Sequence, residues 1–297
     1  MPIAPSPAVL RAGDLLEFLQ KRPTEACSVS ELARAVGIPR ATCDAILQAL
    51  AVHRLVTRRE EGRRQYVLGP ANIGLGEAAR RANPMLPAAR VAAEQLARAM
   101  RTCVAVSIRD GDMIRVAEVF DFAPMLALRV RVGQAIALVP PFGAVFVAWD
   151  EDAEQWIAAA DTEEDRNRYR LALAEVRRRG YSVGGSASRT PELEMIERLA
   201  EASDAASGFY DRSLQLDELT LSRYLDTDVD DAATVRVGQI SAPVFGPDER
   251  VTASLLVPGP DRRVTGAELH ALAERITAAA REATRSAGGR APDPPPR

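Results

Sequence analysis

The sequence predicts an α+β protein with a small, mainly helical domain at the N-terminus and a larger domain of antiparallel strands and helices behind it. The length of 297 residues is enough for about two domains. Apolar residues recur at helical spacing as far as His53, and alternating patterns bounded by turn sequences begin at Leu55 and again at Cys103. The change from helical spacing to alternating patterns predicts the α+β class.

The N-terminal domain is predicted to begin with helices. Apolar residues at helical spacing place the first from Val9 to Leu19. Ser28 and Glu31 have the spacing of a capping box and begin a short second helix. Gly37 ends that helix, because glycine readily takes the left-handed conformation found at many helix C-termini. A further helix follows from Pro39 to about His53.

The helix from Pro39 has one apolar face and one outward face. The apolar residues recur every three or four positions, as in a helix packed on a core, and they are Cys43, Ile46, Leu47 and Leu50. The outward residues of such a helix would enter the major groove of DNA. Our candidates for DNA contacts are Arg40, Ala41, Thr42, Asp44, Ala45 and Gln48.

A basic hairpin follows directly. Strands are predicted from Leu55 to Arg59 and from Gln65 to Leu68, around a turn at 60–64. Helices followed by a basic hairpin form a winged helix-turn-helix, whereas a helix pair alone is also typical of proteins that bind no DNA. The expected phosphate contacts are Arg58, Arg59, Arg63 and Arg64.

The charge is distributed unevenly. Residues 1–81 hold 12 Lys or Arg and 8 Asp or Glu, a net charge of +4, so with −3 for the whole chain the remainder is −7. A basic segment attracts phosphate backbones, although a +4 excess also occurs in segments that bind nothing.

Two helices are predicted next, Ile73–Arg81 and Pro87–Thr102, and the break between them places the domain boundary near residue 82. A tight turn at 110–112 joins the first two strands of the second domain. The predicted elements are strands Cys103–Ile108, Met113–Phe120 and Met125–Val132, helix Asp165–Arg179, strands Val237–Phe245 and Val251–Val257, and helix Thr265–Ser286. They form an antiparallel sheet with helices packed on it.

The order and spacing of several segments resemble the IclR family of bacterial transcription regulators. The matching segments are Val29–Thr42, Tyr66–Pro70, Val132-Gly133, Arg177–Tyr181, Ile240–Phe245 and Leu255–Pro260. The resemblance implies a winged helix-turn-helix, a linker helix that forms a dimer, and a GAF-like effector-binding domain. The corresponding boundaries are 1–70 for DNA binding, 71–86 for the linker, 87–286 for the effector-binding domain with an acidic insertion at about 184–233, and 287–297 for a disordered tail.

Two features depart from the family pattern. The family usually has a basic residue in place of Ala45 and often His or Tyr in place of Asp44. A carboxylate there is repelled by phosphate but can accept from a cytosine amino group, so Asp44 either specifies a base or lowers affinity. The second departure is segment 184–233, with 12 acidic residues against 4 Arg, where Thr190-Pro191-Glu192 is expected to begin a helix. This segment forms either a solvated surface or a binding site.

The expected effector pocket lies where the loop Gly133–Pro141 and a helix beginning near Phe142 cover the sheet, the region that lines the effector cavity in the family. The candidate contacts are the apolar Ala135, Leu138, Phe142 and Phe146 and the polar Gln239, Ser241 and Ser254. Apolar walls with few polar groups suit a small ligand with an apolar body and one polar end. The resemblance implies an acidic or aromatic metabolite, and a neutral ligand is the alternative. A filled core is the alternative for each residue, and Gln239 stands where the family often has Cys.

The composition argues against other classes of protein. The three cysteines and two histidines have no metal-ligand spacing, and no nucleophile lies near a base, so no catalytic, metal-binding or cofactor-binding residue is predicted. The apolar runs are too short to span a membrane and the first residues lack a secretory pattern, so we expect a cytoplasmic protein.

The sequence therefore predicts a DNA-binding transcription regulator that binds a double-stranded operator as a homodimer or homotetramer and responds to a small-molecule effector. The alternative is a ligand-sensing family member that has lost specific DNA binding and acts through a protein partner, which the residues at Asp44 and Ala45 allow. The operator sequence, the effector and the choice between repressor and activator are left open.

Overall fold

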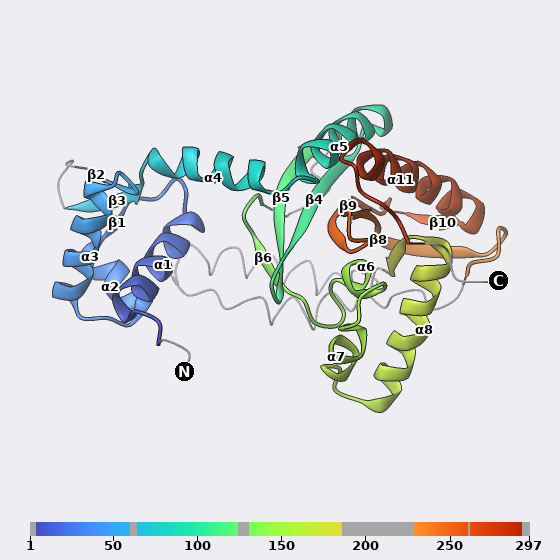
Figure 1. Ribbon diagram of the computed structural model, residues 1–297, viewed down its shortest axis with the longest axis horizontal. Helices are drawn as coiled ribbons and strands as arrows, with labels where there is room; N and C mark the ends of the chain where they lie inside the picture. Colours follow the sequence, from blue (N-terminus) through green and yellow to red (C-terminus); the bar gives the residue numbers. More distant parts are fainter. Residues whose placement is uncertain (1–3, 60–63, 124–130, 186–227, 261, 293–297) are drawn as a thin grey trace. The chain divides into compact units, whose positions relative to one another are not determined.

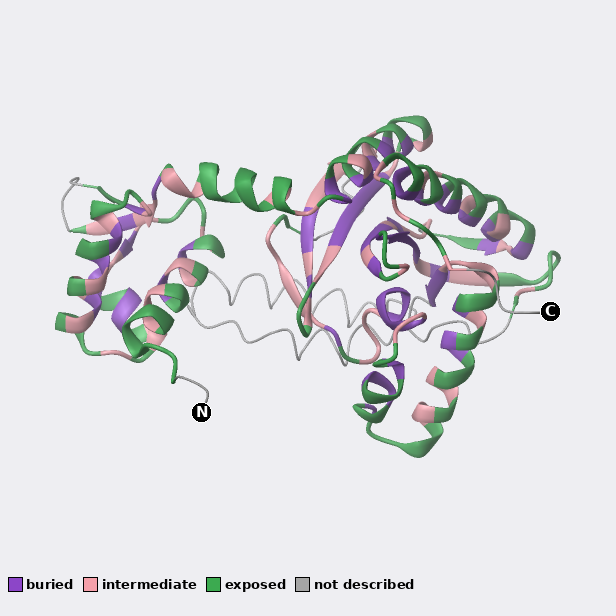
Figure 2. Ribbon diagram, in the orientation of Figure 1, coloured by how far each residue is buried: buried purple, intermediate pink, exposed green. Residues whose placement is uncertain are grey.

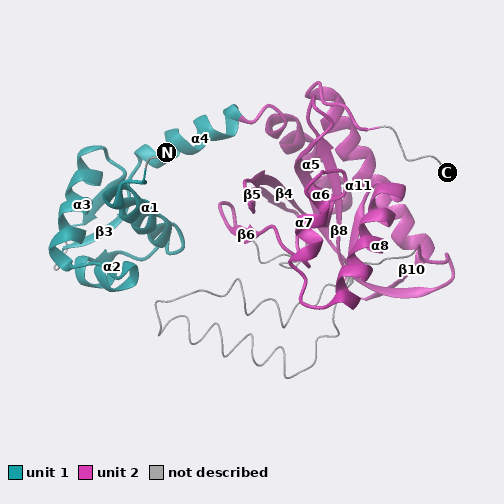
Figure 3. Cartoon of the chain, turned by 60° about the horizontal axis from the view of Figure 1, so that its bottom comes forward, with its two compact units in different colours: residues 1–82, 203–209 teal, residues 83–202, 210–297 magenta. Residues whose placement is uncertain are grey.

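The computed structural model describes residues 4–59, 64–123, 131–185, 228–260 and 262–292 (Figure 1). The described residues divide into two compact units, unit 1 up to Ala82 and unit 2 from Asn83 onward (Figure 3). No single described helix is long and apolar enough to cross a membrane. The helices at Val29–Val36 and Arg40–Val52 reach that length and hydropathy only together, across a bend of 108°.

Unit 1 is a winged helix-turn-helix. Its elements are α1 (Pro7–Gln20), β1 (Cys27–Ser28), α2 (Val29–Val36), α3 (Arg40–Val52), β2 (Val56–Arg59), β3 (Gln65–Leu68) and α4 (Ala71–Ala82). The strands form an antiparallel sheet in the order β1-β3-β2. α1, α2 and α3 enclose a core whose fully buried members include Leu15, Leu19, Leu32, Cys43 and Leu47.

The predicted helices of unit 1 are confirmed, with differences at their ends and faces. α3 begins at Arg40, and Pro39 lies outside it as the N-cap residue. Ile46, predicted in the core stripe, is only half-buried. Val9 and Leu10 are 69% and 55% exposed, so the apolar spacing at the start of α1 does not mark its core face. β1 was not predicted, because two residues give no periodic signal.

Unit 2 is an antiparallel sheet with helices on it. Its elements are α5 (Leu86–Met100), β4 (Cys103–Asp110), β5 (Met113–Asp121), β6 (Ala135–Ala137), α6 (Ala144–Val147), α7 (Ala153–Ala158), α8 (Glu163–Arg179), β7 (Ser182–Gly185), β8 (Thr234–Phe245), β9 (Val251–Pro258), β10 (Arg263–Thr265) and α11 (Gly266–Ser286). The strand order is β10-β8-β9-β4-β5-β6, with β7 also paired to β8. The mixed α+β class predicted for the chain is confirmed.

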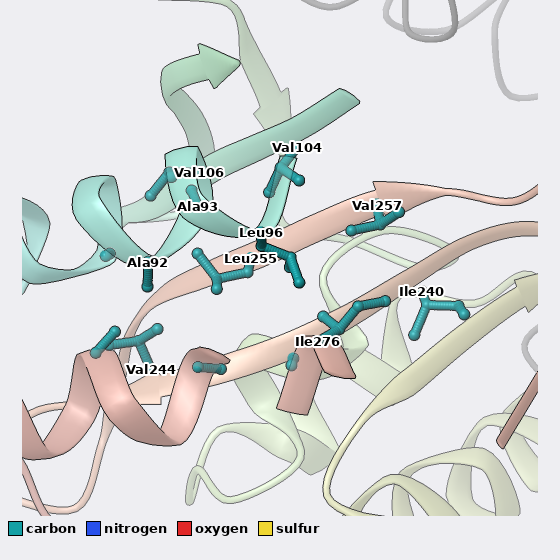
Figure 4. Packing of buried hydrophobic residues seen from close by; sticks show 14 of the residues in the cluster. Ala92, Ala93, Leu96, Val104, Val106, Ile240, Val244, Leu255, Val257 and Ile276 are labelled. Carbon is teal, nitrogen blue, oxygen red and sulfur yellow. The ribbon is translucent and has the colours of Figure 1, made fainter. Parts of the chain in front are cut away.

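Helices α5 and α11 cover one face of this sheet. Figure 4 shows the contact, in which Leu96 of α5 and Ile276 of α11 pack with side chains such as Val104, Ile240 and Leu255 from the strands. Because side chains alternate between the faces of a strand, every second residue of β4, of β9 and of β8 from Ile240 to Val244 points into this core. A second core cluster lies around α6, α7 and α8 and includes Phe146, Trp156 and Phe245.

Several boundaries in unit 2 differ from the predicted ones. The predicted loop Gly133–Pro141 contains β6, which pairs with β5 at Ile136 and Ile114. The helix expected near Phe142 is α6 and begins at Ala144. The predicted strand Met125–Val132 lies outside the described residues except for its last two positions, of which Val132 is in a turn. α7, β7 and β10 were not predicted, because short elements give too few residues to establish a period.

The ends of three predicted domains also differ. Met85 and Leu86 are buried in the core of unit 2, so the second unit begins before the predicted residue 87. Gly184 and Gly185 belong to β7, whereas most of the acidic insertion, including the expected helix start at Thr190-Pro191-Glu192, lies outside the described residues. The predicted disordered tail is ordered at its start, because Arg290 N donates to Gly246 O at 3.0 Å and Arg290 pairs with Glu249.

Candidate DNA-binding and effector sites

The turn between α2 and α3 is fixed by local contacts. The Ser28 hydroxyl accepts from Glu31 N at 3.3 Å, and the Glu31 carboxylate accepts from Ser28 N at 2.7 Å, so the predicted capping box is confirmed. These hydrogen bonds from Ser28 lower the pKa of Glu31. Gly37 ends α2 in the left-handed region with φ 69°, and Ile38 N donates back to Ala33 O at 2.9 Å. The chain therefore enters α3 at a defined angle.

The outer face of α3 presents most of the predicted contact residues. Arg40, Ala41, Ala45 and Gln48 are exposed, while Thr42 and Asp44 are half-buried. Gln48 Nε2 donates to Asp44 Oδ2 at 3.0 Å. The face thus has one arginine at its N-terminal end and an amide–carboxylate pair one turn further on.

The hairpin β2–β3 presents arginines to solvent. Val56 and Tyr66 are buried and anchor the two strands in the core of unit 1. Arg58 and Arg59 on β2 and Arg64 just before β3 are exposed, and among the described residues none of the three forms an ion pair. Unpaired guanidinium groups on a hairpin beside α3 suit contacts to a phosphate backbone. Arg63, the fourth predicted contact, lies outside the described residues.

In unit 2, the sheet face opposite α5 and α11 has four buried serines. Ser107 of β4 is paired with Ser254 of β9, and Ser182 of β7 with Ser241 of β8. Directly paired residues point to the same face of a sheet. Ser241 is two residues from Pro243, the partner of Ser254 on β8, so all four side chains share one face. We call this group, with exposed fractions of 2–5%, the serine face.

The hydroxyl groups of the serine face have no hydrogen-bond partner in the described part of the chain. None of the four oxygens is among the completely buried polar atoms that lack a partner in the described part of the chain, so each hydroxyl keeps some contact with its surroundings outside the protein. Four such groups on one surface are therefore donors and acceptors that a bound molecule could use.

The predicted effector contacts fall into two groups. Gln239, half-buried, shares the face and strand of Ser241 and lies opposite Gly184, so the structure brings the three predicted polar residues together. Leu138 and Phe146 instead belong to the filled core around α6. Phe142 packs at the margin of that core, where its carbonyl accepts from Trp156 Nε1 at 2.9 Å, and Ala135 lies half-buried on β6.

Ser107 and Ser182 were missed by the sequence reasoning. The available signal was a serine at an inward position of an otherwise apolar strand, as in Cys103–Ile108. A buried polar residue in a strand requires a partner or a function.

Arg109 lies on the same face as the serines, and acidic side chains neutralise its charge. Arg109, two residues beyond Ser107 on β4, donates to Asp150 and, at 3.3 Å, to Asp152. Burial raises the pKa of Asp150, but the hydrogen bonds from Asp152 N and Arg109 outweigh it and leave that pKa below its usual value. Arg109 and Asp150 line an open hollow of about 340 Å³ together with Arg250, Val251 and Thr252.

The fold and the two sites define a class of protein: a DNA-binding domain of the winged helix-turn-helix type joined to an α+β domain with a candidate ligand site. Residues 8–60 match the sequence profile of the IclR helix-turn-helix domain. No curated protein matches the sequence.

Solved structures extend the likeness to the whole chain. An IclR transcriptional regulator from Alicyclobacillus acidocaldarius is 20% identical, with 96% of this chain and 98% of that chain covered and a TM-score of 0.66. HmgR of Pseudomonas aeruginosa is 20% identical over 95% and 99% of the two chains, with a TM-score of 0.62. An IclR homologue from Microbacterium hydrocarbonoxydans, solved with 4-hydroxybenzoate, is 14% identical over 94% and 99%, also with 0.62.

These comparisons confirm the resemblance to the IclR family, by sequence for residues 8–60 and by fold for the rest of the chain. At such low identity the structural likeness establishes the fold. The roles of individual residues must be argued from this chain itself.

Proposed function

We propose that this protein is a transcription regulator whose affinity for an operator is controlled by a small molecule bound at the serine face. The observation that supports DNA binding most strongly is the combination of the exposed outer face of α3 with arginines on the adjoining hairpin that pair with no other described residue. α3 would enter the major groove, and Arg58, Arg59, Arg63 and Arg64 would bind phosphates in the cytoplasm, where the DNA is.

A second copy of the chain is the expected partner of α4. α4 has no buried residue, and its apolar Ile73 and Leu75 are 77% and 59% exposed, as the exposed colouring of this helix in Figure 2 shows. Apolar residues exposed on a helix that has no buried residue favour pairing with an identical helix. A two-fold dimer, alone or as half of a tetramer, would place two α3 helices on a palindromic or pseudo-palindromic operator.

The proposed effector is a small molecule with an apolar body and a polar end. The polar end would bond to the hydroxyls of the serine face and to Gln239, and its apolar part would lie toward Phe142, which packs on the cluster that includes Ile114 on this side of the sheet. Ala135 is paired with Arg115 and lies on the opposite face, so it is not one of the proposed contacts. The IclR homologue solved with 4-hydroxybenzoate supports an aromatic acid as one class to test, since that molecule has such a body and such an end.

A footprint on the DNA around the protein's own gene tests the proposed function. The expected result is a protected site with two-fold symmetry at low salt. Absence of any protected site at low salt would contradict the proposal and favour a ligand-sensing protein that acts through a protein partner.

A further inference from the structure

The pair Asp44 and Gln48 on α3 has a defined hydrogen-bond direction. A carboxylate only accepts hydrogen bonds, so the contact of 3.0 Å requires the amide nitrogen of Gln48 to face Asp44 Oδ2. The amide group is planar, and its carbonyl oxygen Oε1 therefore points away from Asp44. In the described part of the chain, Oε1 has no partner, and the side chain of Gln48 is exposed.

The contribution of Asp44 to the fold does not explain its presence. Its second oxygen, Oδ1, is buried and has no hydrogen-bond partner among the described residues. A buried acceptor without a donor destabilises a folded protein. The adjoining exposed residues Ala41 and Ala45 add no polar group, so Gln48 supplies the hydrogen-bonding atoms of this part of the face, which are Oε1 and the second N–H of its amide.

We propose that Asp44 is a positioning residue, which holds Gln48 so that Oε1 selects an operator base with an exocyclic amino group, cytosine or adenine. The inference rests on the proposed function. In the major groove cytosine presents its N4 amino group and adenine its N6 amino group, whereas guanine presents only acceptors and thymine an acceptor and a methyl group. Only one N–H of the Gln48 amide is used by Asp44. The second N–H lies beside Oε1, so adenine can donate from N6 to Oε1 and accept at N7 from Nε2, whereas cytosine would donate to Oε1 alone.

The test begins with operators selected from random DNA by the full-length protein. In a selected operator, replacing cytosine by 2-pyrimidinone or adenine by purine removes only the amino group. At one position in each half-site this replacement should weaken binding about tenfold, as a lost base contact typically does. Gln48→Ala should lose the sensitivity at that position, because the acceptor is gone.

Asp44→Ala tests the positioning role. The freed amide of Gln48 can turn its nitrogen outward, so the position should now also accept guanine or thymine, while Asp44→Asn, which keeps an acceptor for Gln48, should retain the original preference. Arg58→Ala is the control for a phosphate contact and should lower affinity for all these operators alike. Thermal melts establish that each variant folds.

The results of these experiments distinguish an error in the proposed function from an error in the inference about Asp44 and Gln48. If selection recovers no preferred site, the proposed function is wrong, and this inference falls with it. If a site is recovered but loss of an amino group never matters, or Asp44→Ala keeps the wild-type base preference, the inference alone is wrong.

Discussion

The two candidate sites differ in how they relate to the protein's own stability. The candidate DNA contacts of α3 and the β2–β3 hairpin are largely exposed, so they can be exchanged at little cost to the fold. The serine face is buried within the sheet that also forms the core of unit 2. Along β9, core residues alternate with residues of the serine face: Leu255 packs against the helices, and Ser254 belongs to the serine face. Burial alone therefore does not identify a structural residue.

The largest expected effect separates the two faces of β9. Leu255→Ala should lower the free energy of unfolding by about 2–5 kcal/mol, because it leaves a cavity between the sheet and its helices. Ser254→Ala, one residue away, removes a hydroxyl without a partner and should change stability little. Denaturant titration of both variants measures the contrast. Equal losses would show that the serine face is ordinary core.

A substitution on the serine face tests whether it borders a binding space. Ser241→Leu should abolish the response of operator binding to small carboxylic acids while leaving the melting temperature near that of the wild type. In a filled core the larger side chain would not fit without strain, and the free energy of unfolding would fall by about 1–3 kcal/mol. Thermal melts and operator binding with 4-hydroxybenzoate and related acids distinguish the cases. A lower melting temperature with the response intact would remove the serine face from consideration.

The side chain of His270 differs from the serine hydroxyls, because both of its ring nitrogens have hydrogen-bond partners. Its ring nitrogens lie 3.0 Å from Asp231 and 3.1 Å from Asp228, and Asp228 is also bound by Arg178, which pairs with Glu175. Both nitrogens face acceptors, so the bonded form is the protonated one. Partial burial lowers the pKa of His270, but the hydrogen bonds to the two carboxylates outweigh it and raise the pKa above 6.5.

Because the pKa of His270 is raised in the folded protein, its contribution to the free energy of unfolding falls as the pH rises. The stabilisation by His270 should be complete below its ordinary pKa of 6.5 and should be lost as pH rises through the raised value in the folded protein. The difference in unfolding free energy between wild type and His270→Gln, followed from pH 6 to about pH 9, should therefore shrink. A difference that stayed constant or grew would contradict the contact.

The smallest expected effect concerns the exposed site. Arg58→Ala should leave the melting temperature unchanged and flatten the plot of log affinity against log salt by about one unit, because one phosphate contact is lost. Fluorescence anisotropy with labelled operator at several salt concentrations measures the slope. A changed base preference with an unchanged slope would mean that Arg58 contacts a base.

The sequence predicted unit 1 well, because its signals are local. A capping box at Ser28 and a glycine at position 37 each fix a helix end through contacts within a few residues. The hairpin of unit 2 around Gly111 was predictable for the same reason, since a positive φ of 64° there suits glycine.

The rest of unit 2 depends on contacts between distant segments. β6 forms only because its backbone pairs with β5, and Ser182 joins the serine face only because β7 pairs with β8, about 59 positions further along at Ser241. In the sequence, the apolar residues Leu138 and Phe146 look equally suited to a pocket or a core, and packing in the cluster around α6, α7 and α8 places them in the core.

The central claim is sequence-specific DNA binding by unit 1, and a specificity ratio tests it most directly. The full-length protein would be titrated with its selected operator and with a scrambled duplex of equal length and composition at physiological salt. The account predicts that the operator binds at least about 10³-fold more tightly, the lower end for specific regulators. Equal affinity for the two duplexes would contradict it.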